Sequence, residues 1–359
     1  MSSTADGSAK GIADCAADGA ATGTARLDWV DTGRGIAIVL VVLYHSVSWI
    51  KGLDPQVAPW VEINAALSTL RMPLFFALSG MFAVKWLTAD WSALLHAKVR
   101  LFAWVLAVWT VIGSSTLVLG QIMNDVPVNL WGSLRAVLLS PVLPRFELWF
   151  IWALALFFVV AKATRRVNVI AQLVVAGAFS VVALGLWITS NTGWTGSVKY
   201  YFFFLCGLHL RSLLIRVAAV RSRPVLVGTV VAWAGLSVGL GVGGLRGVVP
   251  LYFLNCVLGV LAGIALSRAL SGIPLLGRLG RQTLPIYLAH TPIVILLLFA
   301  VHSAPIWPLP PVLAAVSPLL LAALATTAAL ALHRALAPTP LRLLYEPPPS
   351  RPRRTTGQR

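Results

Sequence analysis

Charged side chains are scarce in this sequence of 359 residues. Only 11% of the residues are charged, whereas 58% are hydrophobic, and the mean hydropathy is +0.86. A soluble domain usually carries about 25% charged residues, so the chain lacks the polar surface that soluble domains would need. Apolar runs of about 17–25 residues, long enough to cross a bilayer, recur along the chain. The composition therefore predicts an all-α fold, a polytopic membrane helix bundle.

Acidic residues and cysteines are also few. Of the 11 Asp and Glu residues, only Glu62 falls within a segment that we expect to span the membrane. Proton-coupled transporters usually depend on carboxylates at membrane depth, so their scarcity disfavours that class. The three cysteines, Cys15, Cys206 and Cys256, have the spacing of neither a metal site nor a redox motif. We expect no bound metal.

Basic residues are plentiful by comparison, with 28 Lys and Arg and a net charge of +17. If the N-terminus is cytoplasmic, 22 of them fall in cytoplasmic segments and adjoining helix ends, five fall outside, and Arg71 alone lies deep in a span. Lys and Arg collect on the cytoplasmic side of membrane proteins, so this asymmetry predicts ten helices with both termini in the cytoplasm. The expected spans are residues 33–50, 60–84, 99–120, 148–164, 169–189, 198–215, 225–243, 248–267, 284–302 and 312–333.

The same asymmetry explains the positive net charge, so nucleic-acid binding is not needed to account for it. Positive loops next to the membrane attract anionic lipid headgroups, whereas nucleic-acid binding requires a basic soluble surface, and the sequence predicts no soluble domain. Residues 1–25 are mostly Ala, Gly, Ser, Thr and Asp, a composition that cannot form a core. We expect a disordered tail at 1–25, a membrane domain at 26–340 and a Pro-rich basic cytoplasmic tail at 341–359.

The first expected helix contains two ionisable residues in the stretch "DTGRGIAIVLVVLYH". Arg34 and His45 are eleven positions apart, which places them on one helix face with an axial separation of about 16 Å. Each has an ordinary explanation when taken alone, since Arg34 can snorkel at the boundary and His45 can bond a neighbouring helix. Together on one face they indicate a functional stripe that faces a polar cavity rather than lipid.

This R-x10-H pattern resembles the first-helix motif of the acyltransferase-3 family of integral membrane O-acyltransferases, and the fucose-acetylase-like branch looks most similar. Five further segments resemble the family's blocks in the family's order. They are "RMPLFFALSGMF" (71–82), "KVRLFAW" (98–104), "ELWFIWAL" (147–154), "YFFFLCGLHL" (201–210) and "LPIYLAHTPI" (284–293). One departure is Ala103-Trp104, where the family usually has a Pro-aromatic step.

The resemblance implies a multi-pass protein of the bacterial cytoplasmic membrane that transfers an acetyl or other short acyl group. The donor would be a cytoplasmic acyl-CoA, in the first instance acetyl-CoA. The acceptor would be a hydroxyl of a cell-envelope glycan, glycolipid or related sugar. The partners are then the lipid bilayer, the acyl-CoA and the acceptor, with no nucleic acid. The alternative is a transporter or flippase for an envelope precursor, although the sequence shows no inverted repeat of the kind many transporters carry.

Acyl transfer requires a base, because a neutral hydroxyl attacks a thioester poorly. His45 is our candidate, since an imidazole titrates near neutral pH, and it acts either as a general base or as a transient carrier of the acyl group. Arg34 stays protonated, so it binds a donor phosphate or holds the catalytic geometry.

Four other residues are candidates for binding the donor. Arg71 precedes Pro73 in the second expected helix, and an arginine beside a helix break at this depth fits a polar cavity. Lys98 and Arg100 are either ordinary cytoplasmic anchors or part of the donor site that the resemblance implies. Ser79, next to a glycine, indicates close helix packing or a lining for the pantetheine arm.

Four residues have secondary interpretations. His290 is either a second catalytic histidine or a structural hydrogen-bonding group, and Tyr287, one turn earlier, is its expected partner. Glu147 and Trp149 open the fourth expected helix on the non-cytoplasmic side, where they would meet a sugar or belong to an aromatic belt.

Overall fold

The computed structural model describes residues 27–123, 125–185, 189, 191–302 and 309–349, and every regular element in these ranges is a helix. The predicted all-α membrane bundle is thereby confirmed. Eight segments of the described chain are long and apolar enough to cross a membrane, and the count becomes nine if one bent helix pair forms a span. They are Asp28–Ile50 (α2), Pro55–Met81 (η1 and α3), Trp91–Met123 (α5 to α6), Phe146–Ala163 (η3 and α8), Arg223–Val242 (α12), Val249–Ala269 (α13), Thr283–Val301 (in α15) and Pro311–Leu336 (α16).

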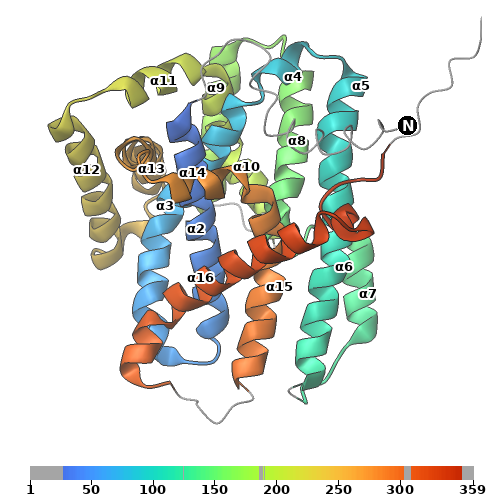
Figure 1. The fold of residues 1–359 in the computed structure, drawn as a ribbon. Coiled ribbons are helices and arrows are strands. Elements are labelled where there is room, and N and C mark those ends of the chain that lie inside the picture. Colours follow the sequence, from blue (N-terminus) through green and yellow to red (C-terminus); the bar gives the residue numbers. More distant parts are fainter. Residues whose placement is uncertain (1–26, 124, 186–188, 190, 303–308, 350–359) are drawn as a thin grey trace, which may run out of the picture.

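Each of the ten expected spans contains a helix, but two of them differ from a simple span. The fifth is α9, Val169–Gly185, with only 17 residues. The sixth is not one straight helix: α10 (Thr192–His209) and α11 (Arg211–Ala219) meet at an angle of 77°. Because α11 carries Arg211 and Arg216, it lies across the top of the bundle in Figure 1 instead of continuing through it. The count of ten therefore stays a prediction.

Several helices were not expected from the sequence because they are short. They are α4 (Val84–Thr88), α5 (Trp91–Leu94), the π-helical turn η2 (Leu95–Val99), α7 (Leu130–Leu139) and α14 (Pro274–Arg281). Of these, α14 packs tightly against the start of α2. A Cβ added at Gly280 would lie 1.7 Å from the carbonyl oxygen of Asp31. Only a residue without a side chain fits where these backbones meet.

The centre of the bundle is formed by α2 and α3 (Ala58–Met81), with α10, α13 and α15 (Thr283–His302) packed against them. Where α3 and α10 cross, a Cβ at Gly80 would lie 2.0 Å from the carbonyl oxygen of Phe204, and one at Gly207 would lie 1.8 Å from that of Ala77. This close approach at Gly80 fits the close-packing interpretation of the Ser79-Gly80 pair.

Hydrogen bonds join helix ends that are far apart in the sequence. At one end, Gln56 donates to the carbonyl of Leu309 and Trp60 to that of Ala315, which joins the start of α3 to the start of α16 (Pro311–Leu336). From there α16 crosses α15 and α2 obliquely in Figure 1. At the opposite end, Trp104 of α6 (Arg100–Met123) donates to the carbonyl of Leu343 in η5 (Pro340–Leu344). The residues after α16 thus return onto α6.

Candidate functional site

The structure brings His45 of α2 and His290 of α15 together in the bundle core. Their ring centroids lie 5.2 Å apart at an interplanar angle of 56°. His290 has no exposed surface, whereas His45 is half-buried and its neighbour Tyr44 is 40% exposed. The α2 face that carries His45 is therefore not fully covered by the neighbouring helices.

His290 is held by hydrogen bonds from both of its ring nitrogens. Nδ1 lies 3.1 Å from the carbonyl oxygen of Ile286 and 2.8 Å from that of Tyr287. Since a carbonyl only accepts, Nδ1 carries a hydrogen. Nε2 lies 3.2 Å from Oγ1 of Thr291. With both nitrogens occupied, His290 has no free nitrogen to take a proton from a substrate, so the structural interpretation of this residue fits the geometry better than a direct catalytic one.

Tyr287 lies beside His290, with ring centroids 5.9 Å apart, and Glu147 contacts Tyr287. Glu147 is 5% exposed. The hydroxyl of Tyr287 donates to the backbone carbonyl of Glu147, while its own carbonyl accepts from His290. Tyr287 therefore is a partner of His290, through its backbone. Thr291 was missed in the sequence, where only its position directly after His290 could have drawn attention.

The backbone before Glu147 is unusual. Phe146, the first residue of η3 (Phe146–Leu148), has φ of +52°, a conformation that non-glycine residues with bulky side chains rarely adopt. The turn directs Glu147 into the core at the start of α8 (Trp149–Ala163). Trp149 instead packs within the bundle, with its ring 6.1 Å from that of Tyr200 and 6.0 Å from that of Phe76.

Arg71 reaches the histidine pair through Tyr44. Its guanidinium lies 4.5 Å from the centroid of the Tyr44 ring, and Nη1 donates to the carbonyl of Leu40 at 3.4 Å. The side chain is buried, with 4% exposure, and Tyr44 in turn lies edge-on to His45 at 4.9 Å. A cation stacked on an aromatic face is stabilised without a carboxylate partner.

Arg34 lies far from the histidines, about 16 Å along α2 as the helix rise requires. Its Nη2 donates to Oγ1 of Thr283 at 2.9 Å, and its guanidinium lies 5.7 Å from the ring centroid of Phe82. Ser79 donates to the carbonyl of Phe75 within its own helix at 2.8 Å. The structure thus places Arg34 near the end of α3 and the start of α15.

The remaining donor-site candidates gather around α4 and η2. Lys98 lies 5.4 Å from the ring centroid of Trp86, and Arg100 contacts His96 at 3.1 Å and the carbonyl of Pro348. These contacts are at the same end of the bundle as Arg34, near the top of Figure 1, where α4 lies.

Lys162 of α8 was counted from the sequence only as a topological charge, yet it is 1% exposed. Its ammonium donates to the carbonyls of Trp86, Leu87 and Ala89. These carbonyls lie at the end of α4, where a helix leaves its last carbonyls without partners of its own, so the cation caps this short helix. No pattern in the sequence distinguishes this lysine from a surface one.

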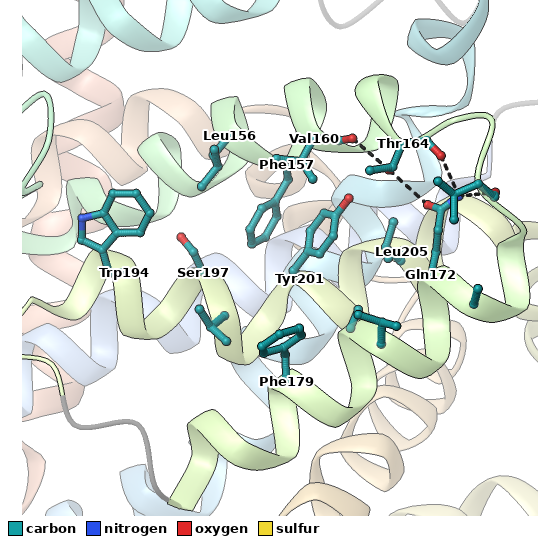
Figure 2. Close-up of a pocket in the computed structure, with 15 residues that line it drawn as sticks. Leu156, Phe157, Val160, Thr164, Gln172, Phe179, Trp194, Ser197, Tyr201 and Leu205 are labelled. Carbon is teal, nitrogen blue, oxygen red and sulfur yellow. Dashed lines mark hydrogen bonds between the residues drawn. The ribbon is translucent and has the colours of Figure 1, made fainter.

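A pocket of the described chain lies away from this site. It has a volume of about 460 Å³ and is enclosed by α8, α9 and α10. Figure 2 shows Phe157, Ser197 and Tyr201 along its length and a hydrogen-bonded Thr164 and Gln172 at one end. None of the residues that line it belongs to the histidine site. Within the described residues, no group of three His, Cys, Asp or Glu side chains is placed to hold a metal ion.

The described part of the chain is a multi-pass helical bundle with a histidine pair and a buried arginine in its core. Ionisable groups at membrane depth mark function in this environment. Residues 27–333 match the Acyl_transf_3 family, which is described as an acyltransferase domain. The match covers most of the chain, so the protein belongs to the acyltransferase-3 family, as its sequence motifs predicted.

A curated relative is similar over a shorter stretch. The inner membrane protein YcfT of Escherichia coli (strain K12) is 26% identical over 156 residues, which cover 38% of this chain and 44% of YcfT. The chain therefore spans less than half the length of this relative. No solved structure shows a significant match.

Proposed function

We propose that this membrane acyltransferase moves an acetyl or other short acyl group from a cytoplasmic acyl-CoA to a hydroxyl of a cell-envelope glycan or glycolipid. The observation that carries the proposal is the position of His45. It lies half-buried in the core of an acyltransferase-family bundle, with Arg71 one aromatic ring away. We place the protein in the bacterial cytoplasmic membrane, with the donor entering at the end of the bundle that carries Arg34.

The reaction joins the hydroxyl oxygen to the acyl carbon and breaks the carbon–sulfur bond of the thioester. In this proposal His45 takes the hydroxyl proton as the oxygen attacks, and the departing sulfur finally receives a proton, so that the products are an ester and free coenzyme A. General-base assistance of this kind contributes about 10²–10⁴-fold to a rate. The same position also suits an acyl-histidine intermediate, which burst kinetics would reveal.

The basic side chains of the site are suited to binding an acyl-CoA donor. Coenzyme A carries several phosphates, and arginine binds phosphate through paired, charge-assisted hydrogen bonds. Arg34, Lys98 and Arg100 lie at one end of the bundle, and Arg71 lies deeper. We propose that the first three hold the phosphates and that Arg71 stabilises the negative charge that develops near the thioester. Ser79 would line the path of the pantetheine arm.

Transfer from acyl-CoA by purified protein in nanodiscs tests the function. We expect His45→Gln to lower transfer at least about 100-fold, because glutamine keeps a hydrogen bond but not the basicity. His209→Gln is the matched control, since His209 contacts Gln172 on α9 and lies outside the histidine pair. Near-wild-type transfer by folded His45→Gln would remove His45 as the base.

The same assay separates the enzyme from the alternative, a transporter or flippase. A transporter would move its substrate without consuming acyl-CoA, whereas the enzyme releases one free thiol for each ester formed. Mass spectrometry of envelope glycans from a deletion strain would then identify the acceptor and the acyl group.

A further inference from the structure

We propose that the pocket between α8, α9 and α10 binds one acyl chain of an anionic phospholipid from the cytoplasmic leaflet, and that Arg165 and Arg166 hold the lipid's phosphate. No residue of the histidine site lines this pocket. The lipid site is therefore separate from the proposed acyl transfer and does not depend on it. Its basis is the shape of the pocket, its length and the charge at one end.

The pocket is a groove with a buried floor and an exposed rim. Phe157 of α8 and Leu205 of α10 are buried, whereas Val175 and Phe179 of α9 are 53% and 55% exposed. Figure 2 shows the aromatic side chains along the groove, where the rings of Phe157 and Tyr201 lie 4.9 Å apart. An apolar rim on a membrane bundle meets lipid, so the groove opens towards the bilayer. Its volume of about 460 Å³ is that of a ligand pocket.

The length of the groove fits a chain of one leaflet. Along α10 its lining runs from Trp194 to Leu205, eleven positions, or about 16 Å of helix. Half of the hydrocarbon core of a bilayer is about 15 Å thick. On α8 and α9 the lining residues fall within 156–164 and 171–179, the parts of these helices nearest the turn that joins them. The Lys and Arg asymmetry predicts that this turn is cytoplasmic.

Hydrogen bonds fix the turn between α8 and α9 at one end of the groove. Gln172 donates from Nε2 to the carbonyls of Thr164 and Val167, at 3.1 and 2.9 Å. Its Oε1 lies 3.3 Å from Nε2 of His209, at the end of α10. All three helices are thus joined where the apolar lining gives way to polar groups, which is the arrangement that a chain with a polar head requires.

The turn presents two arginines with no acidic partner. Arg165 and Arg166 are exposed, and neither forms an ion pair within the part of the chain that the structure describes. Arg165 donates to the carbonyl of Leu87 at 3.0 Å, which leaves other guanidinium N–H groups for a ligand. The sequence has no acidic residue between Glu147 and Glu346. A lipid phosphate supplies the missing negative charge, and arginine binds it through paired hydrogen bonds.

The observations favour a phospholipid over a long-chain acyl-CoA. An acyl-CoA with its chain in the groove would hold its thioester at the α8–α9 turn, and the groove contains no residue of the histidine site. A phospholipid has no reacting atom to deliver. Because lipid tails already surround the bundle, apolar burial alone gives no selectivity, so the fit of the chain and the charge of the headgroup must select the ligand.

Native mass spectrometry of the full chain, released from detergent, tests the headgroup site. Phosphatidylglycerol should bind more tightly than zwitterionic phosphatidylcholine. Arg165→Gln with Arg166→Gln should weaken phosphatidylglycerol binding roughly 25-fold, about fivefold for each arginine. The matched control is Arg221→Gln with Arg223→Gln, a second pair of exposed arginines predicted to be cytoplasmic, which should leave binding unchanged. Equal losses in both double variants, or equal affinity for the two lipids, would overturn the proposal.

A pair of neighbouring substitutions tests the groove. Val175→Trp fills it and should weaken phosphatidylglycerol binding about tenfold or more, because the ring occupies the space of the chain. Val174 is 64% exposed on the same helix but does not line the groove, so Val174→Trp should bind lipid as the wild type does. Both positions are exposed, so both variants should fold. Wild-type binding by Val175→Trp would overturn the site, and labelling of the groove by a photoreactive long-chain acyl-CoA that phosphatidylglycerol does not displace would overturn the choice of ligand.

Discussion

The crossing of α3 and α10 offers a stability prediction whose size follows from the backbone. Gly80 and Gly207 face each other's helices, and a Cβ at Gly207 would lie 1.8 Å from the carbonyl oxygen of Ala77. Real Cβ contacts are essentially never closer than 3.0 Å. Gly207→Ala must therefore push the two helices apart by the shortfall between these values, 1.2 Å. The obstacle is main chain, so no side-chain rotation can relieve it.

Overpacking of this kind costs about 1–3 kcal/mol, and we expect the upper part of that range, about 3 kcal/mol. For a chain of 359 residues that corresponds to a fall of about 4 °C in the unfolding temperature. The assay heats the detergent-solubilised protein and measures how much remains in the monodisperse peak. Gly80→Ala should behave alike, because its Cβ would lie 2.0 Å from the carbonyl oxygen of Phe204. The double variant should cost less than the two single effects added, since one separation relieves both contacts.

Gly235→Ala is the matched control. Gly235 lies inside α12, and nothing lies within 4 Å of an added Cβ. Alanine favours the helix by up to about 1 kcal/mol over glycine, so this variant should be as stable as the wild type or slightly more stable. Equal unfolding temperatures for Gly207→Ala and Gly235→Ala would refute the inference that backbone contact at the α3–α10 crossing stabilises the bundle.

Two further predictions concern the topology and the donor. Reporter fusions after residues 55, 195 and 305 should be non-cytoplasmic and those after 90, 220 and 275 cytoplasmic, because Lys and Arg collect on the cytoplasmic side; a cytoplasmic signal after 195 would contradict the ten-helix topology. Arg71→Ala and Arg100→Ala should each weaken acyl-CoA binding about tenfold or more in a direct binding assay, and added salt should weaken wild-type binding through screening. Unchanged binding in both variants would place the donor elsewhere.

Much of the architecture follows from local properties of the chain. A bilayer core offers no partners for backbone groups, so each long apolar run must form a helix, and this physical rule is sufficient to predict every long helix of the described structure. Helix periodicity likewise places Arg34 and His45 on one face of α2, because 3.6 residues per turn is a local constant. The order of the motifs was sufficient to predict the family.

The partners of those residues could not be found in the same way. His45 and His290 are 245 positions apart, and nothing local brings one ring to the other. Glu147 was expected at the non-cytoplasmic side, either to meet a sugar or to belong to an aromatic belt, whereas its side chain is buried after the turn at Phe146. From the sequence, Lys162 cannot be told from a lysine that anchors a helix end at the cytoplasmic surface. In the structure it donates to carbonyls at the end of α4. Hydrogen bonds and glycine crossings between distant segments depend on how helices pack, and that packing is a property of the whole bundle rather than of any one stretch of sequence.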